Sequence, residues 1–496
     1  MSLHRSHPRY FWVNAALAVM AFSYVGYRAA VLSITYDEAW TILDFVPNTI
    51  RGIFSCEPCD ANNHLLHTLI LKILFWFVND RSEILARLPN VLSFLLYLHF
   101  AQRISSSLFS GWMKVLVFFL LIANPFLLDF FSLARGYGMS FALQLGSLHY
   151  FLSFSRHRSL KHAYLSVVLG ALASLANLTQ LTYLLTLIAL IMLITFISDR
   201  EKIGRVFLGV GAIAIILASI LLIPIRKMLA LDAFYYGGKN GIFQDTMMSL
   251  VDHGMYTAHD RGVVQMVLLI FVVLLIALAI AAIRRDRRVL SIPSLMLCML
   301  IICLLSIEIQ HQLFGTRYVI DRGALYLYPI IIILLASSVQ EIPAGRFKKV
   351  IGISIVSCFV INLAMSVNFH KTDLWDFEAH TKGILTDLET IGRREDRFVT
   401  VDHSWPFRAA TRYYASRGVF PHVQLLTKPG GDHSVDHNAQ FYIHLGRPLS
   451  TAYYRPELQE LDASRCDTIE AFPEEDVYLL TDLHFRSVKE ITRSAR

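Results

Sequence analysis

Long apolar runs dominate the first three quarters of the chain, and short polar or basic connectors separate them. Most are close to the ~20 residues that a helix needs to cross a bilayer. This pattern predicts a mainly α-helical, polytopic membrane protein with about eleven transmembrane helices. The runs lie at 10–34, 88–103, 113–131, 138–155, 163–178, 180–198, 206–224, 263–283, 290–308, 324–340 and 348–368.

The composition supports the same class of protein. Hydrophobic residues make up 55% of the 496 residues and charged residues only 17%, whereas soluble globular chains are about 45–50% apolar and about 25% charged. The formal net charge of +7 comes from the connectors and does not indicate nucleic-acid binding. The basic leader lacks a clear small-residue cleavage site, so we expect an uncleaved first helix.

The basic connectors predict the orientation of the chain. All of them fall on one side if the N-terminus is cytoplasmic, which is the positive-inside pattern. The C-terminal region then lies outside the cytoplasm, and four polar loops emerge on that same outer face. The basic connectors are His4–Arg9, Arg103–Lys114, Arg156–Lys161, Arg200–Arg205, Arg284–Arg288 and Arg346–Lys349.

The first outer loop, residues 33–68, concentrates polar side chains. Apolar residues at helical spacing over 38–53 predict an amphipathic helix along the membrane interface. The apolar run 65–78, at about 14 residues, is short for a span and predicts a second interfacial or re-entrant helix. A later outer loop, residues 226–261, is long and contains glycines, which predicts a mobile lid.

After residue 368 charges become frequent and long apolar runs disappear. We therefore expect two domains, a transmembrane domain over 1–368 and a small soluble α/β domain over 369–496. The predicted elements of the second domain are helices at 375–391 and 407–416 and strands at 397–401, 441–444 and 477–481.

The adjacent carboxylates Asp37 and Glu38 are the strongest candidates for chemistry. A carboxylate near a helix start can cap the helix, because it accepts backbone N–H groups and suits the helix dipole. The functional alternative is a general base, which needs a carboxylate within hydrogen-bond reach of an acceptor hydroxyl. An inverting displacement at a glycosyl centre needs one such base.

Three arginines, Arg135, Arg317 and Arg322, lie at the ends of apolar runs. Each alone has the position of an interfacial anchor that reaches toward the headgroups. Together on one face they predict a phosphate clamp, because guanidinium groups present a planar fork to phosphate oxygens. Tyr137 follows the first of them in the same turn.

A polar segment between the two predicted interfacial helices has several interpretations. Its Asn and His side chains can open a helix as a capped turn, or they can bind sugar hydroxyls or a phosphate. Two cysteines and two histidines nearby can ligate zinc, or the cysteines can form a disulfide. The residues are Asn62, Asn63 and His64 for the turn, and Cys56, Cys59, His64 and His67 for zinc.

Four motifs in this order resemble the GT-C-fold, polyprenyl-phosphate-sugar-dependent glycosyltransferases: YDEAW, ANNHLLHTL, LARGYGMS and DRGALYLYP. The resemblance covers about residues 10–340 and points to glycosyltransferase family 39/83. That superfamily includes protein O-mannosyltransferases, the lipid A aminoarabinose transferase and an RgtA/B/C/D-like bacterial group.

The resemblance implies an enzyme of the bacterial plasma (inner) membrane that takes a sugar from a polyprenyl phosphate on the outer face. By this similarity Asp37 occupies the catalytic acidic position with Glu38 beside it, and Arg135 and Arg322 face the lipid phosphate. Many relatives have a His-Pro-Pro segment where this chain has Asn62 to His64, so the role of His64 stays open. The sugar and the acceptor, whether lipid, glycan or protein, stay open as well. No cofactor is indicated with certainty, and a divalent metal stays possible.

The main alternative is a polytopic transporter, or a flippase or binding protein for a lipid-linked sugar. Transporters place ionisable groups near the bilayer midplane on broken helices and often contain internal repeats. The apolar runs here are largely free of charges, and no convincing repeat is found. We therefore prefer the transferase interpretation.

Overall fold

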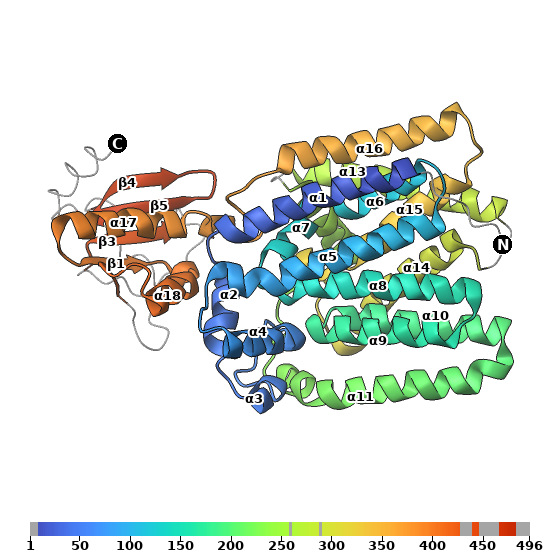
Figure 1. Ribbon diagram of the computed structural model, residues 1–496, viewed down its shortest axis with the longest axis horizontal. Coiled ribbons are helices and arrows are strands. Elements are labelled where there is room, and N and C mark those ends of the chain that lie inside the picture. Colours follow the sequence, from blue (N-terminus) through green and yellow to red (C-terminus); the bar gives the residue numbers. More distant parts are fainter. Residues whose placement is uncertain (1–7, 257–259, 287–289, 427–438, 446–465, 483–496) are drawn as a thin grey trace. The chain divides into compact units, whose positions relative to one another are not determined.

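The computed structural model describes residues 8–256, 260–286, 290–426, 439–445 and 466–482 (Figure 1). The basic connectors at 4–9 and 284–288 therefore lie partly outside the described residues. The chain divides into two compact units. The first comprises Met1–Ala29, Asn48–Asn79 and Ile84–Val367, and the second comprises Ala30–Pro47, Asp80–Glu83 and Asn368–Arg496.

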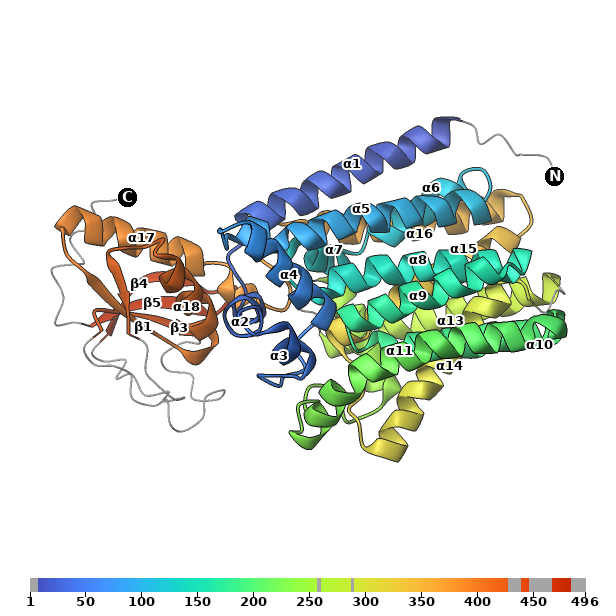
Figure 2. The ribbon, with the colours of Figure 1, turned by 60° about the horizontal axis from the view of Figure 1, so that its bottom comes forward.

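The first unit is a bundle of long helices (Figure 2). Short 3-10 helices at Arg200–Lys202 and Asp321–Gly323 and a π-helix at Ile242–Met247 complete it. Its α-helices are α1 Pro8–Val31, α3 Ile50–Phe54, α4 Leu65–Phe77, α5 Glu83–Leu108, α6 Met113–Ile122, α7 Pro125–Ser132, α8 Gly136–His157, α9 Leu160–Ala176, α10 Gln180–Ser198, α11 Ile203–Ala230, α12 Met248–Met255, α13 Arg261–Arg285, α14 Ile292–Phe314, α15 Leu327–Glu341 and α16 Arg346–Ser366.

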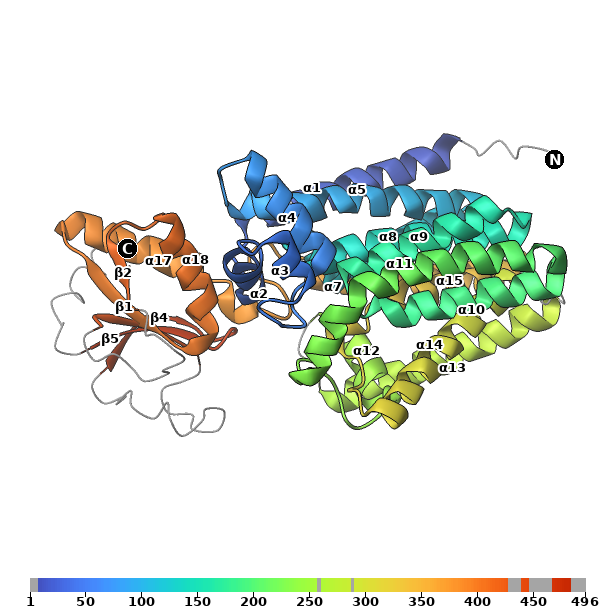
Figure 3. The ribbon, with the colours of Figure 1, turned by 90° about the horizontal axis from the view of Figure 1, so that it is seen from below.

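Each apolar run of the sequence folds as helix, and the protein is an integral, multi-pass membrane protein. Seven helices are long and apolar enough to cross a membrane, or eight if the bent pair α6 and α7 is one span. The helices α8 and α15 are buried along most of their length (Figure 3). Neither is among the seven, because α15 has only 15 residues and α8, although 22 residues long, is not apolar enough.

The predicted run at 113–131 is broken in the structure. The helices α6 and α7 meet at a bend of 59°. Pro125 occupies the first turn of α7, where its missing N–H costs nothing. The Asn124 side chain accepts a hydrogen bond from the Leu127 N–H at 2.9 Å and caps the new helix.

The prediction of one amphipathic helix over 38–53 is wrong. The segment forms a short helix α2 at Tyr36–Trp40, continues as π-helix over Thr41–Phe45, and ends before Pro47. A proline cannot continue the helical hydrogen bonds, so the chain turns and α3 starts afresh at Ile50. The predicted second helix of this loop is present as α4.

The second unit contains a five-stranded sheet in the order β2-β1-β3-β5-β4. Strands β1, β2 and β3 are parallel, and β5 pairs antiparallel with both β3 and β4. The predicted helices and strands are present, whereas strands β2 and β4 were not predicted. The elements are α17 Thr381–Glu395, α18 Arg408–Arg417, β1 Val399–His403, β2 Val423–Leu425, β3 Phe441–Leu445, β4 Cys466–Phe472 and β5 Val477–Asp482.

A buried ion pair joins three helices of the first unit. Arg28 near the end of α1 donates to the carboxylate of Asp129 on α7, and both side chains are buried. The hydroxyl of Tyr256, which follows α12, lies 3.0 Å from both carboxylate oxygens. Removing one member of such a pair leaves a charge buried without compensation.

We expect the substitution Arg28→Met to lower the free energy of unfolding by about 3–5 kcal/mol, because Asp129 then stays charged and buried. The double variant Arg28→Met/Asp129→Leu should recover much of that loss. Thermal unfolding of both purified variants in detergent checks this. A double variant that is no more stable than the single one would contradict the ion pair's structural role.

Candidate functional site

The start of α8 is the point where the predicted polar residues of the first unit meet. Arg135 precedes α8 and is fully buried. Its guanidinium group donates to the side-chain oxygen of Asn62, 73 positions away in the sequence. Its carbonyl accepts a hydrogen bond from the buried amide of Asn90 on α5. The arginine therefore connects the first loop with α5 and α8.

Gly136 permits the close contacts around this arginine. A Cβ atom at this position would lie 2.1 Å from the carbonyl oxygen of Ala176 and 2.6 Å from the Cβ atom of His64. No side chain fits in that space. The absence of a side chain lets the end of α9 and the His64 side chain approach the first turn of α8.

Two arginines lie near one aromatic ring. The guanidinium carbon of Arg135 lies 5.9 Å from the centre of the Tyr137 ring, and that of Arg322 lies 5.8 Å from it. Arg322 also lies 5.0 Å from the ring centre of Tyr236. Tyr236 belongs to the predicted lid loop 226–261, whose described part contains the end of α11, a π-helix and α12. These distances suit cation–π attraction, which orients both guanidinium groups around one ring.

His64 is a neutral member of the same group. Its buried ring stands edge-on to Tyr137, with the ring centres 4.8 Å apart. Burial first, and then the charges of Arg135 and Arg322, hold the pKa of the His64 imidazole well below its usual value. Its Nε2 atom is buried and has no hydrogen-bond partner among the described residues, so it can accept a hydrogen bond.

Asp321 ties the lid loop to the segment that carries Arg322. One carboxylate oxygen accepts from the Tyr236 hydroxyl at 2.5 Å, and the other lies 2.8 Å from Nε2 of His253. Burial is the largest single influence and opposes ionisation, but the hydrogen bond and charge of His253, the bond from Tyr236 and the charge of Arg322 together hold the pKa of Asp321 below its usual value. A two-residue bridge between Gly238 and Tyr318 joins the same two loops.

We name these side chains the arginine cluster. The first unit thus brings together five predicted site residues and one that was not predicted, from four separate segments. Two guanidinium groups, a neutral imidazole, an amide and two phenolic rings form a site with the chemistry to bind an anion. The members of the arginine cluster are Asn62, His64, Arg135, Tyr137, Tyr236 and Arg322.

Two predicted residues have other surroundings. The Asn63 amide is buried and holds its own loop, since it donates to the Ile53 carbonyl at 3.3 Å and accepts from the Thr68 hydroxyl at 3.0 Å. Arg317 is half-buried beside Gly237. Within the described residues, no ion pair or ring contact joins Arg317 to the arginine cluster.

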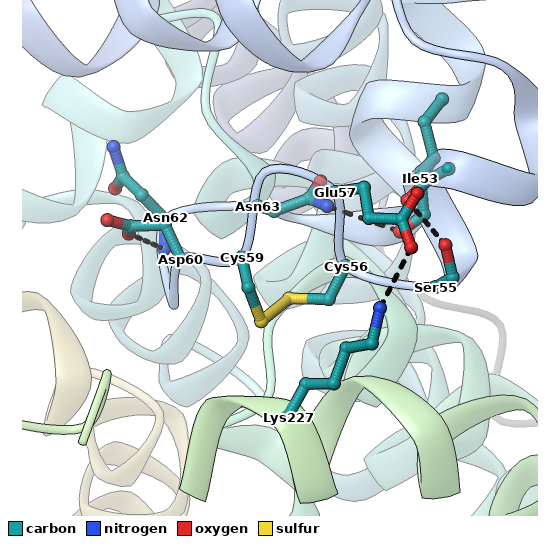
Figure 4. The surroundings of a disulfide bond; sticks show 10 residues. Ile53, Ser55, Cys56, Glu57, Cys59, Asp60, Asn62, Asn63 and Lys227 are labelled. Atoms are coloured by element: carbon teal, nitrogen blue, oxygen red, sulfur yellow. Dashed lines mark hydrogen bonds and ion pairs between the residues drawn. A yellow bond between two sulfur atoms is a disulfide. The ribbon is translucent and has the colours of Figure 1, made fainter. Parts of the chain in front are cut away.

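The two cysteines of the first loop form a disulfide, Cys56–Cys59, beside Glu57 and Lys227 (Figure 4). Sulfur atoms bonded to each other are not thiolate ligands, so this structure does not hold the zinc set with His64 and His67. In the parts of the chain that the structure describes, no group of three or more His, Cys, Asp or Glu residues is arranged to hold a metal ion.

The acidic pair lies in the second unit, on α2, and its members have different surroundings. Glu38 is fully buried and completes a capping box, in which its carboxylate accepts from the Thr35 N–H at 2.9 Å. The Thr35 hydroxyl accepts from the Glu38 N–H in return. The capping interpretation therefore applies to Glu38, whereas the Asp37 carboxylate takes no part in this box.

A third carboxylate of the same unit lies close to this pair. Glu378 is 1% exposed and accepts from the Tyr36 N–H at 2.5 Å. Its second oxygen is buried with no hydrogen-bond partner among the described residues. Burial first, and then the negative charges of Asp37 and Glu38, raise the pKa of Glu378 well above its usual value.

Sequence reasoning missed two of these residues for different reasons. Tyr236 stands in the Tyr235-Tyr236-Gly237-Gly238 stretch, and aromatic residues beside glycines in a long loop were a usable signal. Glu378 is one of many acidic residues in the polar C-terminal region, and no local pattern distinguishes it.

No protein-family model matches the sequence, and no curated protein matches it. Among solved structures, the chain is similar to ArnT from Cupriavidus metallidurans bound to undecaprenyl phosphate, with 15% identity, a TM-score of 0.47, and coverage of 84% of this chain and 74% of that chain. The apo state of the same ArnT is similar with 15% identity, a TM-score of 0.46, and coverage of 82% and 73%. At this identity neither structure assigns a role to any residue here.

We expect the substitution Glu378→Gln to stabilise the protein more at pH 8 than at pH 5. The folded protein keeps Glu378 protonated, whereas the unfolded chain ionises it near its usual pKa of 4.5. A carboxyl with a raised pKa therefore loses its stabilising contribution as the pH rises above that value. Glutamine does not titrate and still accepts from Tyr36. Unfolding temperatures of both proteins at the two pH values check this, and a difference that does not change with pH would contradict it.

Proposed function

We propose that this protein is an inverting membrane glycosyltransferase that moves a sugar from a polyprenyl phosphate to an acceptor hydroxyl. The arginine cluster carries the proposal, because its two guanidinium groups and neutral imidazole suit a phosphate that loses its sugar. The order of the YDEAW, ANNHLLHTL, LARGYGMS and DRGALYLYP motifs supports it, since members of the cluster come from three of them.

In the proposed reaction, the acceptor oxygen attacks the anomeric carbon of the sugar and forms the new glycosidic bond. The bond between that carbon and the phosphate oxygen breaks, and its electron pair leaves with the polyprenyl phosphate. Asp37 takes the proton from the acceptor hydroxyl. Attack opposite the leaving group inverts the anomeric centre.

The phosphate leaving group explains why cations and not a strong acid are needed. Polyprenyl phosphate leaves as an anion, so Arg135 and Arg322 stabilise charge that develops in the transition state. The free Nε2 of neutral His64 can accept a hydrogen bond from a sugar hydroxyl. Tyr236 and Asp321 attach the lid loop to the arginine cluster, and a closed lid excludes water that would hydrolyse the donor.

The proposed setting is the outer face of a bacterial plasma membrane, with the N-terminus in the cytoplasm and the region after residue 368 outside it. The distribution of basic connectors supports this orientation. The sugar and the acceptor, whether lipid, glycan or protein, are not specified by any residue described above.

The substitution Asp37→Asn should reduce transfer by about 10²–10⁴-fold, the usual contribution of a general base. Glu38→Gln is the matched control, because glutamine at this position preserves the capping box, and it should keep activity within a few-fold of the wild type. The assay is release of polyprenyl phosphate from radiolabelled polyprenyl-phosphate sugars. Equal losses in both variants would argue against Asp37 as the base.

The substitution Arg322→Gln should lower kcat/KM for the donor by roughly tenfold or more, because a hydrogen bond to a charged group contributes about 1.5–3 kcal/mol. Arg317→Gln serves as control, since it removes a cation from the same loop outside the arginine cluster, and it should have little effect. kcat/KM for the donor measures both. If Arg317→Gln is the more damaging variant, the phosphate site is misassigned.

Saturable donor binding without turnover, unaffected by Asp37→Asn, would favour the alternative of a flippase or a lipid-linked-sugar binding protein. Measuring both turnover and donor binding of the Asp37→Asn variant therefore distinguishes a transferase from a protein that only binds or moves the donor.

A further inference from the structure

A cavity of about 630 Å³ lies in the first unit, between α3 and the C-terminal part of α11. None of its lining residues belongs to the arginine cluster, and the function proposed above does not use it. Its walls combine cationic, hydroxyl and apolar side chains. Those that matter here are Arg51, Ser55, Glu57, Ser219, Ile223 and Lys227.

The polar side of the cavity contains two cations and one carboxylate. The Nζ atom of Lys227 lies 2.9 Å from a carboxylate oxygen of Glu57 (Figure 4). Arg51 is exposed and has no ion-pair partner among the described residues. The Lys227–Glu57 pair is neutral overall, so Arg51 provides a surplus positive charge at the cavity.

The disulfide closes the loop that carries Glu57 at this cavity. Cys56 and Cys59 flank Glu57 and close the loop that follows α3. The hydrogen bond from Lys227 on α11 first, and then that from Ser55, hold the pKa of Glu57 below its usual value. The carboxylate is therefore ionised at neutral pH and competes with any anion for Lys227.

The apolar side of the cavity continues onto the outer surface of α11. Ile220 and Ile223 line it, and Ile223 and its neighbour Leu222 are exposed. The helix is 28 residues long and counts among the helices that can cross the membrane. Lys227 lies in its last turn, so the cavity lies at the depth of the lipid headgroups, with the apolar helix surface facing the chains.

We propose that this cavity binds the headgroup of an anionic phospholipid. Arg51 and Lys227 contact the phosphate, Ser55 and Ser219 offer hydroxyl hydrogen bonds, and one acyl chain lies along Ile220 and Ile223. Positive charge near a membrane surface attracts anionic lipid by about 1 kcal/mol for each Lys or Arg. A soluble anion lacks the chain that would cover the apolar wall, so a lipid is the occupant that fits both sides.

Native mass spectrometry of the full chain in a neutral detergent tests the proposal. Phosphatidylglycerol and phosphatidylcholine are added at equal concentrations, and the first bound lipid is quantified. We expect the wild type to bind phosphatidylglycerol preferentially and Arg51→Gln to lower that affinity about fivefold. Glu57→Gln should raise the affinity, because it frees Lys227 for the phosphate.

Arg226→Gln is the matched control, since Arg226 is an exposed cation next to Lys227 that does not line the cavity. It should leave the affinity unchanged, and Arg51→Lys should retain most of it. Equal binding of the two lipids, equal losses in Arg226→Gln and Arg51→Gln, or displacement of the lipid by millimolar inorganic phosphate would each overturn the proposal. These readouts measure lipid binding alone, so they are independent of whether the transferase activity is found.

Discussion

The hydrogen bonds of one buried arginine determine how the polar loops of the first unit are arranged. A guanidinium group loses its hydration on burial and is stable only when protein groups replace the water. The guanidinium group of Arg135 donates to Asn62, while the carbonyl of Arg135 accepts from the amide of Asn90. Gly136 then lets the carbonyl of Ala176, at the end of α9, contact the first turn of α8. Four segments of the bundle are held at this one point.

The grouping of cations in the first unit follows from that arrangement. Once Arg135 is fixed, Tyr137 in the first turn of α8 presents its ring beside it, and Arg322 lies near the same ring. Asp321 holds the lid loop against the same segment through Tyr236 and His253. The cluster is thus built from contacts that also fold the bundle, so the fold itself orients its cations.

In the second unit, the acidic segment and the C-terminal domain fold together. The Tyr414 hydroxyl accepts from the Ile34 N–H at 3.0 Å, and Glu378 accepts from the Tyr36 N–H. The Ser33 hydroxyl donates to the Ala379 carbonyl at 2.9 Å. The C-terminal region therefore supplies the backbone partners of the segment that carries Asp37. The boundary at residue 368 marks the point where hydropathy changes along the sequence. It does not show that Ala30–Pro47 belongs to the same compact unit as the C-terminal region.

Local pattern was enough to predict the membrane class, the helical runs and most elements of the C-terminal domain. Apolar length and periodicity act within one segment, and they need no knowledge of distant residues. Local pattern was also enough to predict that several candidate residues lie near the ends of helices, namely Arg135, Arg322, Asn62 and His64. Strands β2 and β4 escaped prediction because β2 is short and both depend on pairing with strands far away in the sequence.

Only the tertiary structure decided which polar groups meet. It assigned Glu38 to a capping box and left the Asp37 carboxylate outside that box, joined Cys56 to Cys59 and placed Arg317 against Gly237. It also brought Glu378 to Asp37 across more than three hundred positions. These outcomes depend on burial and on pairing between distant segments, which spacing along the chain does not encode.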